Sequence, residues 1–285
     1  MIRTRLRYHA PEDIEEACSL LGAREEAAVL GGGTWLVPLM TRGERRVSDV
    51  VDLRRLDLGV IEDGDGQVVV GAMATYAEVL ASSVLRERAP LLYTAAAGVT
   101  GGKQIHNLGT LGGSACYAFP SSDVPACLVA LGARMRIYGA AGVREVPAQE
   151  FFLDAFRSAA GPGEILTSIV IPVLASGVGY YKLKLSEGSW PIATAAAVAG
   201  DAASNTELGP SVTLGGVART PLRIDATEVL DSAAGDGVTE RLDALIAEHL
   251  TDPWDDELAP AWYRRSVAPA VARRALKQAI EGRER

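Results

Sequence analysis

The stretch that decides the fold reads Ala27-Ala28-Val29-Leu30-Gly31-Gly32-Gly33-Thr34, a short apolar run that stops at three glycines. Such a run is typical of a buried strand that enters a tight turn. Glycine lacks a Cβ and tolerates positive φ, so the main chain can bend around a charged group and direct several amide N–H groups at it. The pattern predicts either an anion-binding turn or a turn that uses glycine for conformational freedom alone.

A second glycine-rich turn, Thr110-Leu111-Gly112-Gly113-Ser114, lies in the segment that starts at Thr100. The hydroxyl groups of Thr34, Thr110 and Ser114 add possible donors beside the two turns. Neither turn has the spacing of a P-loop or of the Rossmann dinucleotide motif. Two such turns in successive α/β units predict a dinucleotide whose diphosphate is held between them.

Composition narrows the class of protein. The chain has 285 residues, of which 48% are hydrophobic and 22% charged, as in a globular protein with more than one folded unit. Its net charge of -8 argues against non-specific nucleic-acid binding. No apolar run of about 20 residues predicts a membrane span, and the N-terminus has no secretory signal pattern.

Cysteine usage points to a reducing compartment. The chain has 3 cysteines and no C-x-x-C motif, so it predicts neither a disulfide framework nor an iron–sulfur cluster held by this chain alone. A cytoplasmic location is the simplest interpretation. The histidines have no metal-site spacing, and Ser114 lies outside a nucleophile elbow.

Apolar periodicity predicts the main elements. We expect helices over 14–21, 75–80, 91–99 and 124–131, with a further helix or irregular turn over 34–40. Strands are expected over 27–30, 47–53, 68–70 and 134–138. After a hinge at 173–179, three antiparallel strands are expected over 180–185, 193–199 and 212–217. The chain after these three strands is predicted to be helical.

Several polar and aromatic residues have two interpretations from pattern alone. Asp123 can cap a helix or bind a ligand hydroxyl. Lys182, on an alternating strand, reads as a solvated lysine. Trp190 can stack on a flat ring or fill the edge of a core. His106 can contact a ligand or lie in a surface loop.

The motifs together resemble those of one family. Val29 to Met40 resembles the first flavin-binding stretch of the FAD-binding (medium) subunits of molybdenum hydroxylases, which include carbon monoxide dehydrogenases and the flavin domain of xanthine dehydrogenases. Gln104 to Ser114 is similar to their second stretch. The similarity continues at Pro120-Ser121-Ser122-Asp123, Leu214 to Ala218, Tyr263-Arg264-Arg265 and Arg273 to Leu276, so it covers nearly the whole chain.

The resemblance implies an α+β fold with a vanillyl-alcohol-oxidase-like (PCMH-type) FAD-binding domain. Its two α/β subdomains would span 1–57 and 58–173. A C-terminal domain over 174–285 would contain a three-stranded antiparallel sheet and a helical bundle. FAD would lie extended between the two subdomains. The residues expected to contact it are Val29, Leu30, Gly31, Gly32, Gly33, Thr34, Trp35, Leu36, Thr100, Gly101, Thr110, Leu111, Gly112, Gly113, Ser114, Asp123, Leu166 and Lys182.

The function implied by the resemblance is electron transfer without a catalytic acid, base or nucleophile in this chain. A [2Fe-2S] small subunit would deliver electrons from a molybdopterin-binding large subunit, and FAD would pass them to NAD⁺, a quinone or another acceptor. Two alternatives stay open. One is a stand-alone FAD-dependent oxidase or dehydrogenase, for which Tyr180, Tyr181 and His106 are the candidate bases. The other is an assembly module that has lost its flavin.

Several positions depart from the family pattern. Tyr117 and Phe119 make the segment after the second turn more aromatic than the carbon monoxide dehydrogenase pattern. Gly31 replaces a common alanine, and Trp35 stands where a small polar residue is common. Trp35 would either crowd the phosphate loop or face outward. His106 replaces a usual arginine, which weakens a charge contact at neutral pH. All the glycines are retained, so the resemblance still implies FAD binding.

Overall fold

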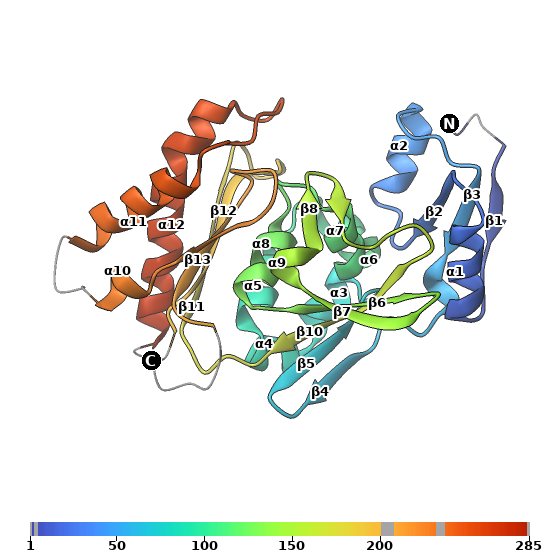
Figure 1. The fold of residues 1–285 in the computed structure, drawn as a ribbon, viewed down its shortest axis with the longest axis horizontal. Coiled ribbons are helices and arrows are strands. Elements are labelled where there is room, and N and C mark those ends of the chain that lie inside the picture. Colours follow the sequence, from blue (N-terminus) through green and yellow to red (C-terminus); the bar gives the residue numbers. More distant parts are fainter. Residues whose placement is uncertain (1, 3–4, 201–207, 232–236, 284–285) are drawn as a thin grey trace.

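The computed structural model describes residues 2, 5–200, 208–231 and 237–283. Three main β-sheets follow one another along the chain, and they extend from right to left in Figure 1. Their strands fall within residues 7–52, 61–172 and 178–225. Each sheet therefore lies inside one of the three segments expected from the sequence, while the boundaries between these segments stay predictions.

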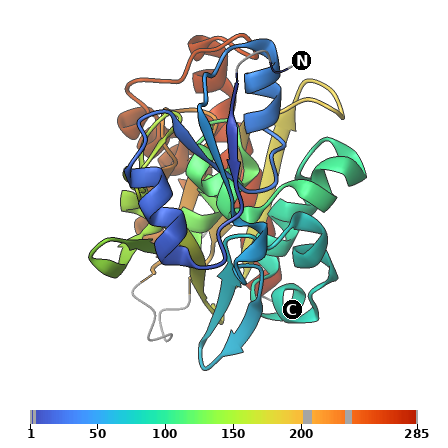
Figure 2. The ribbon, with the colours of Figure 1, turned by 90° about the vertical axis from the view of Figure 1, so that its right-hand side faces the viewer.

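The N-terminal sheet is parallel, with the strand order β1-β3-β2. The predicted strands and helices are found, and β1 is an addition that periodicity did not show because only three residues pair. Figure 2 views this sheet with the rest of the molecule behind it. The elements are β1 (Arg7–His9), α1 (Ile14–Gly22), β2 (Ala27–Leu30), α2 (Leu36–Arg42), β3 (Asp49–Asp52) and the 3-10 turn η1 (Leu53–Arg55).

The middle sheet is antiparallel, with the order β4-β5-β10-β6-β7. Helices cover it, and a small hairpin, β8-β9, lies beside it. The elements are β4 (Ile61–Gly64), β5 (Gln67–Gly71), α3 (Tyr76–Ala81), α4 (Ser83–Arg88), α5 (Pro90–Gly98), α6 (Gly102–Leu108), α7 (Leu111–Tyr117), α8 (Asp123–Ala130), β6 (Arg134–Gly139), β7 (Gly142–Pro147), α9 (Ala148–Phe151), β8 (Phe152–Asp154), β9 (Arg157–Ser158) and β10 (Ile165–Pro172).

The C-terminal sheet has four strands among the described residues, in the order β11-β12-β13-β14, so the expectation of three strands is wrong. The missed strand, β14, is a four-residue edge strand that starts directly after Pro221 and pairs with β13. Such a short edge strand has too few residues to show alternation. The elements are β11 (Val178–Lys184), β12 (Pro191–Val198), β13 (Ser211–Gly215), β14 (Leu222–Asp225), α10 (Thr227–Asp231), α11 (Gly237–His249) and α12 (Ala261–Arg283).

A buried arginine ties α12 to the rest of the molecule. The Arg264 side chain is 0% exposed, and it donates to Ser121 Oγ at 3.3 Å and to the carbonyl oxygen of Gly216 at 2.5 Å. It also donates to the carbonyl oxygen of Ile192 and pairs with Asp256. A buried guanidinium is tolerated only when its donors are satisfied. Arg264 therefore fixes the C-terminal sheet against the segment that leads into Asp123.

Candidate functional site

The two glycine turns lie against each other. A Cβ placed on Gly32 would lie 1.7 Å from the carbonyl oxygen of Leu108, and one on Gly31 would lie 3.2 Å from Thr110 Oγ1. No side chain fits at Gly32, because its neighbour there is backbone. The two turns, which are far apart in sequence, are therefore in direct contact.

Unpartnered amides mark the first turn. Within the described chain, the amide N–H groups of Gly32, Gly33, Thr34 and Trp35 have no backbone acceptor. Gly33 adopts a φ of 69°, a conformation that glycine allows without strain. These four residues all line one cavity. Consecutive amide donors without a protein acceptor are suited to a diphosphate.

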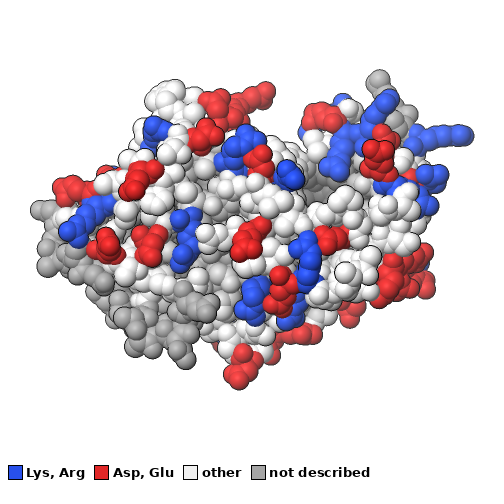
Figure 3. Space-filling view, in the orientation of Figure 1, with Lys and Arg blue, Asp and Glu red and all other residues white. Residues whose placement is uncertain are grey.

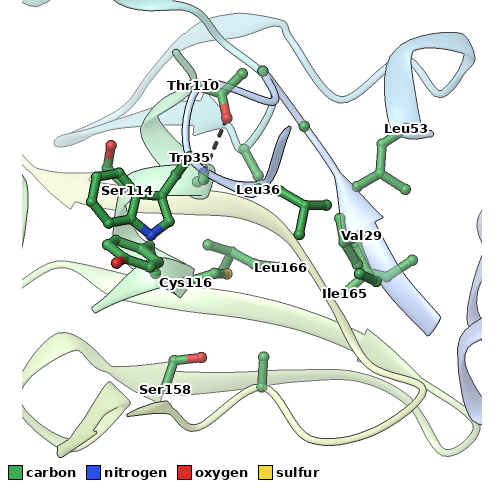
Figure 4. Close-up of a pocket in the computed structure, with 18 of the residues that line it drawn as sticks. Val29, Trp35, Leu36, Leu53, Thr110, Ser114, Cys116, Ser158, Ile165 and Leu166 are labelled. Carbon is green, nitrogen blue, oxygen red and sulfur yellow. Dashed lines mark hydrogen bonds between the residues drawn. The ribbon is translucent and has the colours of Figure 1, made fainter. Parts of the chain in front are cut away.

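The second turn has its amides occupied. The Gly112 amide donates to the carbonyl oxygen of Ala72 at 2.9 Å, and the Ser114 amide to that of Thr110 at 3.1 Å. The Gly113 amide donates to Thr110 Oγ1 at 3.0 Å, the bond drawn as a dashed line in Figure 4. Thr110 thus caps α7. The glycines of this turn allow close packing, because a Cβ on Gly112 would lie 2.5 Å from Ala72 Cβ.

The cavity beside the turns has a volume of about 830 Å³, toward the upper end of the range for ligand pockets. Residues from all three parts of the chain line it. Figure 3 shows the surface hollowed between the N-terminal part and the rest of the molecule, with charges of both signs around the hollow. Fourteen of the predicted residues line the cavity: Val29, Gly31, Gly32, Gly33, Thr34, Trp35, Leu36, Thr100, Thr110, Gly112, Gly113, Ser114, Asp123 and Leu166.

The other four predicted residues lie elsewhere. Leu30, Gly101, Leu111 and Lys182 do not line this cavity, and the Leu111 side chain is in the core. Gly101 and Lys182 line a second, more open cavity of about 680 Å³. Thr100 lines both cavities, so the two adjoin there.

Aromatic rings gather at the cavity. The Trp35 ring lies 4.5 Å from that of Tyr117 and 5.9 Å from that of Trp190. Phe119 and Phe156 extend the group, with their rings stacked at 5.3 Å. Trp35 therefore turns toward the cavity, and its buried Nε1 has no hydrogen-bond partner among the described residues. Trp190 contacts these rings rather than a separate core edge.

Asp123 belongs to a buried polar group rather than to a helix cap. Ser122 occupies the N-cap position of α8. The Asp123 side chain accepts hydrogen bonds on Oδ1 from the Tyr180 hydroxyl and, at 2.9 Å, from Lys182 Nζ. Lys182 Nζ also donates to the carbonyl oxygen of Gly98. The interpretation of Lys182 as a solvated lysine is thus wrong, because β11 packs this side chain against α5 and α8.

Hydrogen bonds occupy the other candidate groups. His106 Nε2 lies 2.8 Å from the carbonyl oxygen of Val99, and His106 does not line the main cavity. The Ser114 hydroxyl bonds the hydroxyl of Tyr76. Burial raises the pKa of the Tyr76 phenol and raises the pKa of the Cys116 thiol to about 12. Both groups therefore stay protonated and do not act as bases or nucleophiles at neutral pH.

Sequence reasoning missed the roles of Tyr76, Tyr180 and Arg264. Each is a large polar side chain that is buried. Each has a partner far away along the chain, at 38 residues for Tyr76, 57 for Tyr180 and 143 for Arg264. Only an unexpectedly polar position within an apolar pattern could have indicated them.

The donor set fits FAD. A turn that excludes side chains, four unpartnered amides, a buried carboxylate and several aromatic rings match a diphosphate, hydroxyl groups and flat rings. Among the described residues, no cluster of His, Cys, Asp and Glu is placed to bind a metal ion. None of the described helices has the length and apolar character needed to cross a membrane.

Comparison with known proteins agrees with this donor set. Residues 4–174 match the family model of the FAD-binding domain in molybdopterin dehydrogenase. The carbon monoxide dehydrogenase medium chain of Afipia carboxidovorans is 35% identical over 98% of this chain and 98% of that chain.

Two solved structures have the same architecture. A carbon monoxide dehydrogenase from Hydrogenophaga pseudoflava superimposes with a TM-score of 0.88 and 32% identity, covering 99% of each chain. Quinoline 2-oxidoreductase from Pseudomonas putida 86 superimposes with a TM-score of 0.87 and 26% identity, covering 100% of each chain.

This chain is a flavoprotein subunit of an oxidoreductase of the molybdenum hydroxylase type. It belongs to the family of FAD-binding domains in molybdopterin dehydrogenases. The predicted family, fold class and cofactor are thereby confirmed, apart from the number of strands in the C-terminal sheet.

Proposed function

We propose that this chain binds FAD in the main cavity and transfers electrons from the iron–sulfur clusters of a small partner subunit to a diffusible acceptor. A molybdopterin-binding large subunit would oxidise the substrate. The observation that carries the proposal is the set of four unpartnered amides, Gly32 to Trp35, at the edge of a cavity large enough for a dinucleotide.

The two glycine turns have different roles in this proposal. The amides of the first turn bind the diphosphate directly. The second turn forms the opposite wall, and it is positioned by its bonds to Ala72 and Thr110. Thr100, Asp123 and Leu166 surround the remainder of the cofactor. Leu30, Gly101, Leu111 and Lys182 act from the second cavity or through packing and main-chain contacts.

The bound FAD supplies two-electron redox chemistry and can exchange single electrons with iron–sulfur clusters. The protein supplies position, shielding from water and electrostatics. Asp123 offers an acceptor for a hydroxyl or N–H group, and Trp35 and Trp190 offer faces for a flat ring. No described residue needs to act as a catalytic base.

The substrate is expected to depend on the large subunit. The superimposed structures are those of a carbon monoxide dehydrogenase and a quinoline 2-oxidoreductase, yet the matched chains superimpose on this chain about equally well, with TM-scores of 0.88 and 0.87. The fold of this chain is therefore compatible with very different substrates. NAD⁺ and a quinone are the acceptors to be compared.

A reconstitution experiment tests the proposed function. The chain is assembled with its two partner subunits, and substrate is added without oxygen. Flavin reduction should follow cluster reduction, and added NAD⁺ or quinone should reoxidise the flavin. A matched assembly that contains a Gly31→Asp variant should reduce its clusters but transfer no electrons further.

The two alternatives predict different results. A stand-alone oxidase would oxidise a small substrate with the isolated chain, without partner subunits. A flavin-less module would be purified without flavin absorbance and would bind no added FAD. Either result would contradict the electron-transfer proposal.

A further inference from the structure

The geometry points to Tyr180 as a positioning residue of the FAD site. We propose that its hydroxyl and the Lys182 ammonium hold one oxygen of the Asp123 carboxylate, so that the other oxygen is presented to the cofactor. This inference rests on the proposed function, and it adds a residue that the glycine motifs do not contain.

The hydrogen bonds around Asp123 are unequal. The hydroxyl of Tyr180 and Nζ of Lys182 both donate to Oδ1. Among the described residues, none donates to Oδ2. Asp123 also lines the main cavity, whereas Tyr180 and Lys182 line the second one. A carboxylate with one oxygen fixed from the protein side can accept from a ligand with the other oxygen.

The surroundings keep Tyr180 in the donor role. Burial, reinforced by the nearby charge of Asp123, raises the pKa of the phenol well above its ordinary value, so it keeps its proton. A Cβ placed on Gly98 would lie 3.7 Å from Tyr180 Cε1 and 3.8 Å from Asp123 Oδ1. Lys182 Nζ lies 3.7 Å from the same position, so the Tyr180 ring and the Lys182 ammonium both hold Asp123 from the side of α5 and β11.

The next residue provides a matched control. Tyr181 points to the other face of β11, as alternation along a strand requires. Its hydroxyl accepts from Arg274, whose guanidinium lies 4.7 Å from the ring centroid. A Tyr181→Phe change removes the same atom from the same strand without a contact to Asp123.

Titration of the flavin-free full chain with FAD tests the inference. Tyr180→Phe should raise the FAD dissociation constant about tenfold, since the carboxylate loses a charge-assisted hydrogen bond that orients it. Tyr181→Phe should change it less than about twofold. Equal effects of the two variants would overturn the inference.

A double-mutant cycle separates positioning from general loosening. If Tyr180 acts through Asp123, Tyr180→Phe should have no further effect on FAD affinity in an Asp123→Ala chain, which lacks the oxygen that Tyr180 bonds. A structural role that does not involve Asp123 would make the two effects multiply, and that result would also overturn the inference.

Folding and the proposed function are checked separately. Circular dichroism reports whether each variant folds. If Tyr180→Phe does not fold, the comparison of Asp123→Ala with Asp123→Ala/Tyr180→Phe still applies, and unequal FAD affinities contradict the inference. A wild-type chain that binds no FAD refutes the proposed function instead. Normal FAD binding with an unaffected Tyr180→Phe variant refutes only the role of Tyr180.

Discussion

The first and second glycine turns look alike in sequence but use glycine for different reasons. In the first turn, the amides of Gly32 to Trp35 lack backbone acceptors and line the cavity. In the second, the amides of Gly112, Gly113 and Ser114 are all occupied, and Gly112 packs against Ala72. A glycine-rich motif can thus mark a ligand contact or the close packing that supports it.

The largest expected effect on folding is at Gly112. In Gly112→Ala, the new Cβ would lie 2.5 Å from Ala72 Cβ and 2.6 Å from the Ala72 carbonyl oxygen. Because both neighbours are fixed, we expect a loss of about 3 kcal/mol in the free energy of unfolding, measured by chemical denaturation of the flavin-free chain.

The control for this prediction is Gly31→Ala in the first turn. Its Cβ would meet only the side chains of Thr110 and Met73, at 3.2 and 3.6 Å. Because Thr110 Oγ1 must shift by only a few tenths of an ångström, we expect a loss below about 1 kcal/mol, well under that of Gly112→Ala. Similar losses at Gly31 and Gly112 would remove the distinction between the two turns.

Substitution of a threonine in either turn should change the free energy of unfolding less than Gly112→Ala does. Thr110→Val removes the oxygen that caps Gly113, so the free energy of unfolding should fall by about 1 kcal/mol. Thr34→Val in the first turn should leave stability nearly unchanged, because the hydroxyl of Thr34 caps no helix in the described chain. Thermal unfolding measures both, and a larger loss for Thr34→Val would contradict this assignment.

Lowering the pH should destabilise the strand pair that precedes the first turn before it destabilises the second turn. Hydrogen bonds from Arg7, with further ones from His9 and Ser48, lower the pKa of Asp49 below its ordinary value of 3.8. Asp49 lies on β3, which pairs with the strand that leads into the first turn. A carboxylate whose pKa is lowered in the folded state stabilises the fold at pH values above its pKa in the unfolded chain. This stabilisation is lost progressively as the pH falls below that unfolded-state pKa and through the folded-state pKa.

Amide hydrogen exchange, measured for individual peptides, reports this local loss of stability. Peptides from the first turn should exchange faster as the pH approaches 3, after correction for intrinsic rates, while peptides from the second turn change less. An Asp49→Asn variant should show the weakened first turn already at neutral pH. Equal responses of the two turns would contradict the prediction.

The sequence could predict the elements with clear apolar periodicity and the family to which the motifs belong. β2, β5, β12 and α8 lie close to the expected positions. The short strands β1 and β14 were missed, because three or four residues show no reliable period. The eight-residue strand β10 was missed as well, because both of its faces are largely buried and its burial does not alternate.

The site was predictable in part. Fourteen of the expected residues line one cavity, yet the sequence could not show which glycine amides are occupied, since their acceptors, such as the Ala72 carbonyl group, lie in other segments. The capping interpretation of Asp123 failed for the same reason. Its partners on β11 become neighbours only through tertiary packing.

The central claim is that the first turn binds the diphosphate of FAD, and titration of Gly31→Asp and Gly31→Asn with FAD tests it most directly. A Cβ on Gly31 would meet only side-chain atoms, the nearest at 3.2 Å, and Gly31 does not have a positive φ, so both variants should fold after a small shift of the Thr110 side chain. The two side chains are similar in size, but only aspartate adds a negative charge beside the diphosphate. We predict an FAD dissociation constant at least about 100-fold higher for Gly31→Asp than for Gly31→Asn. Equal dissociation constants would contradict the claim.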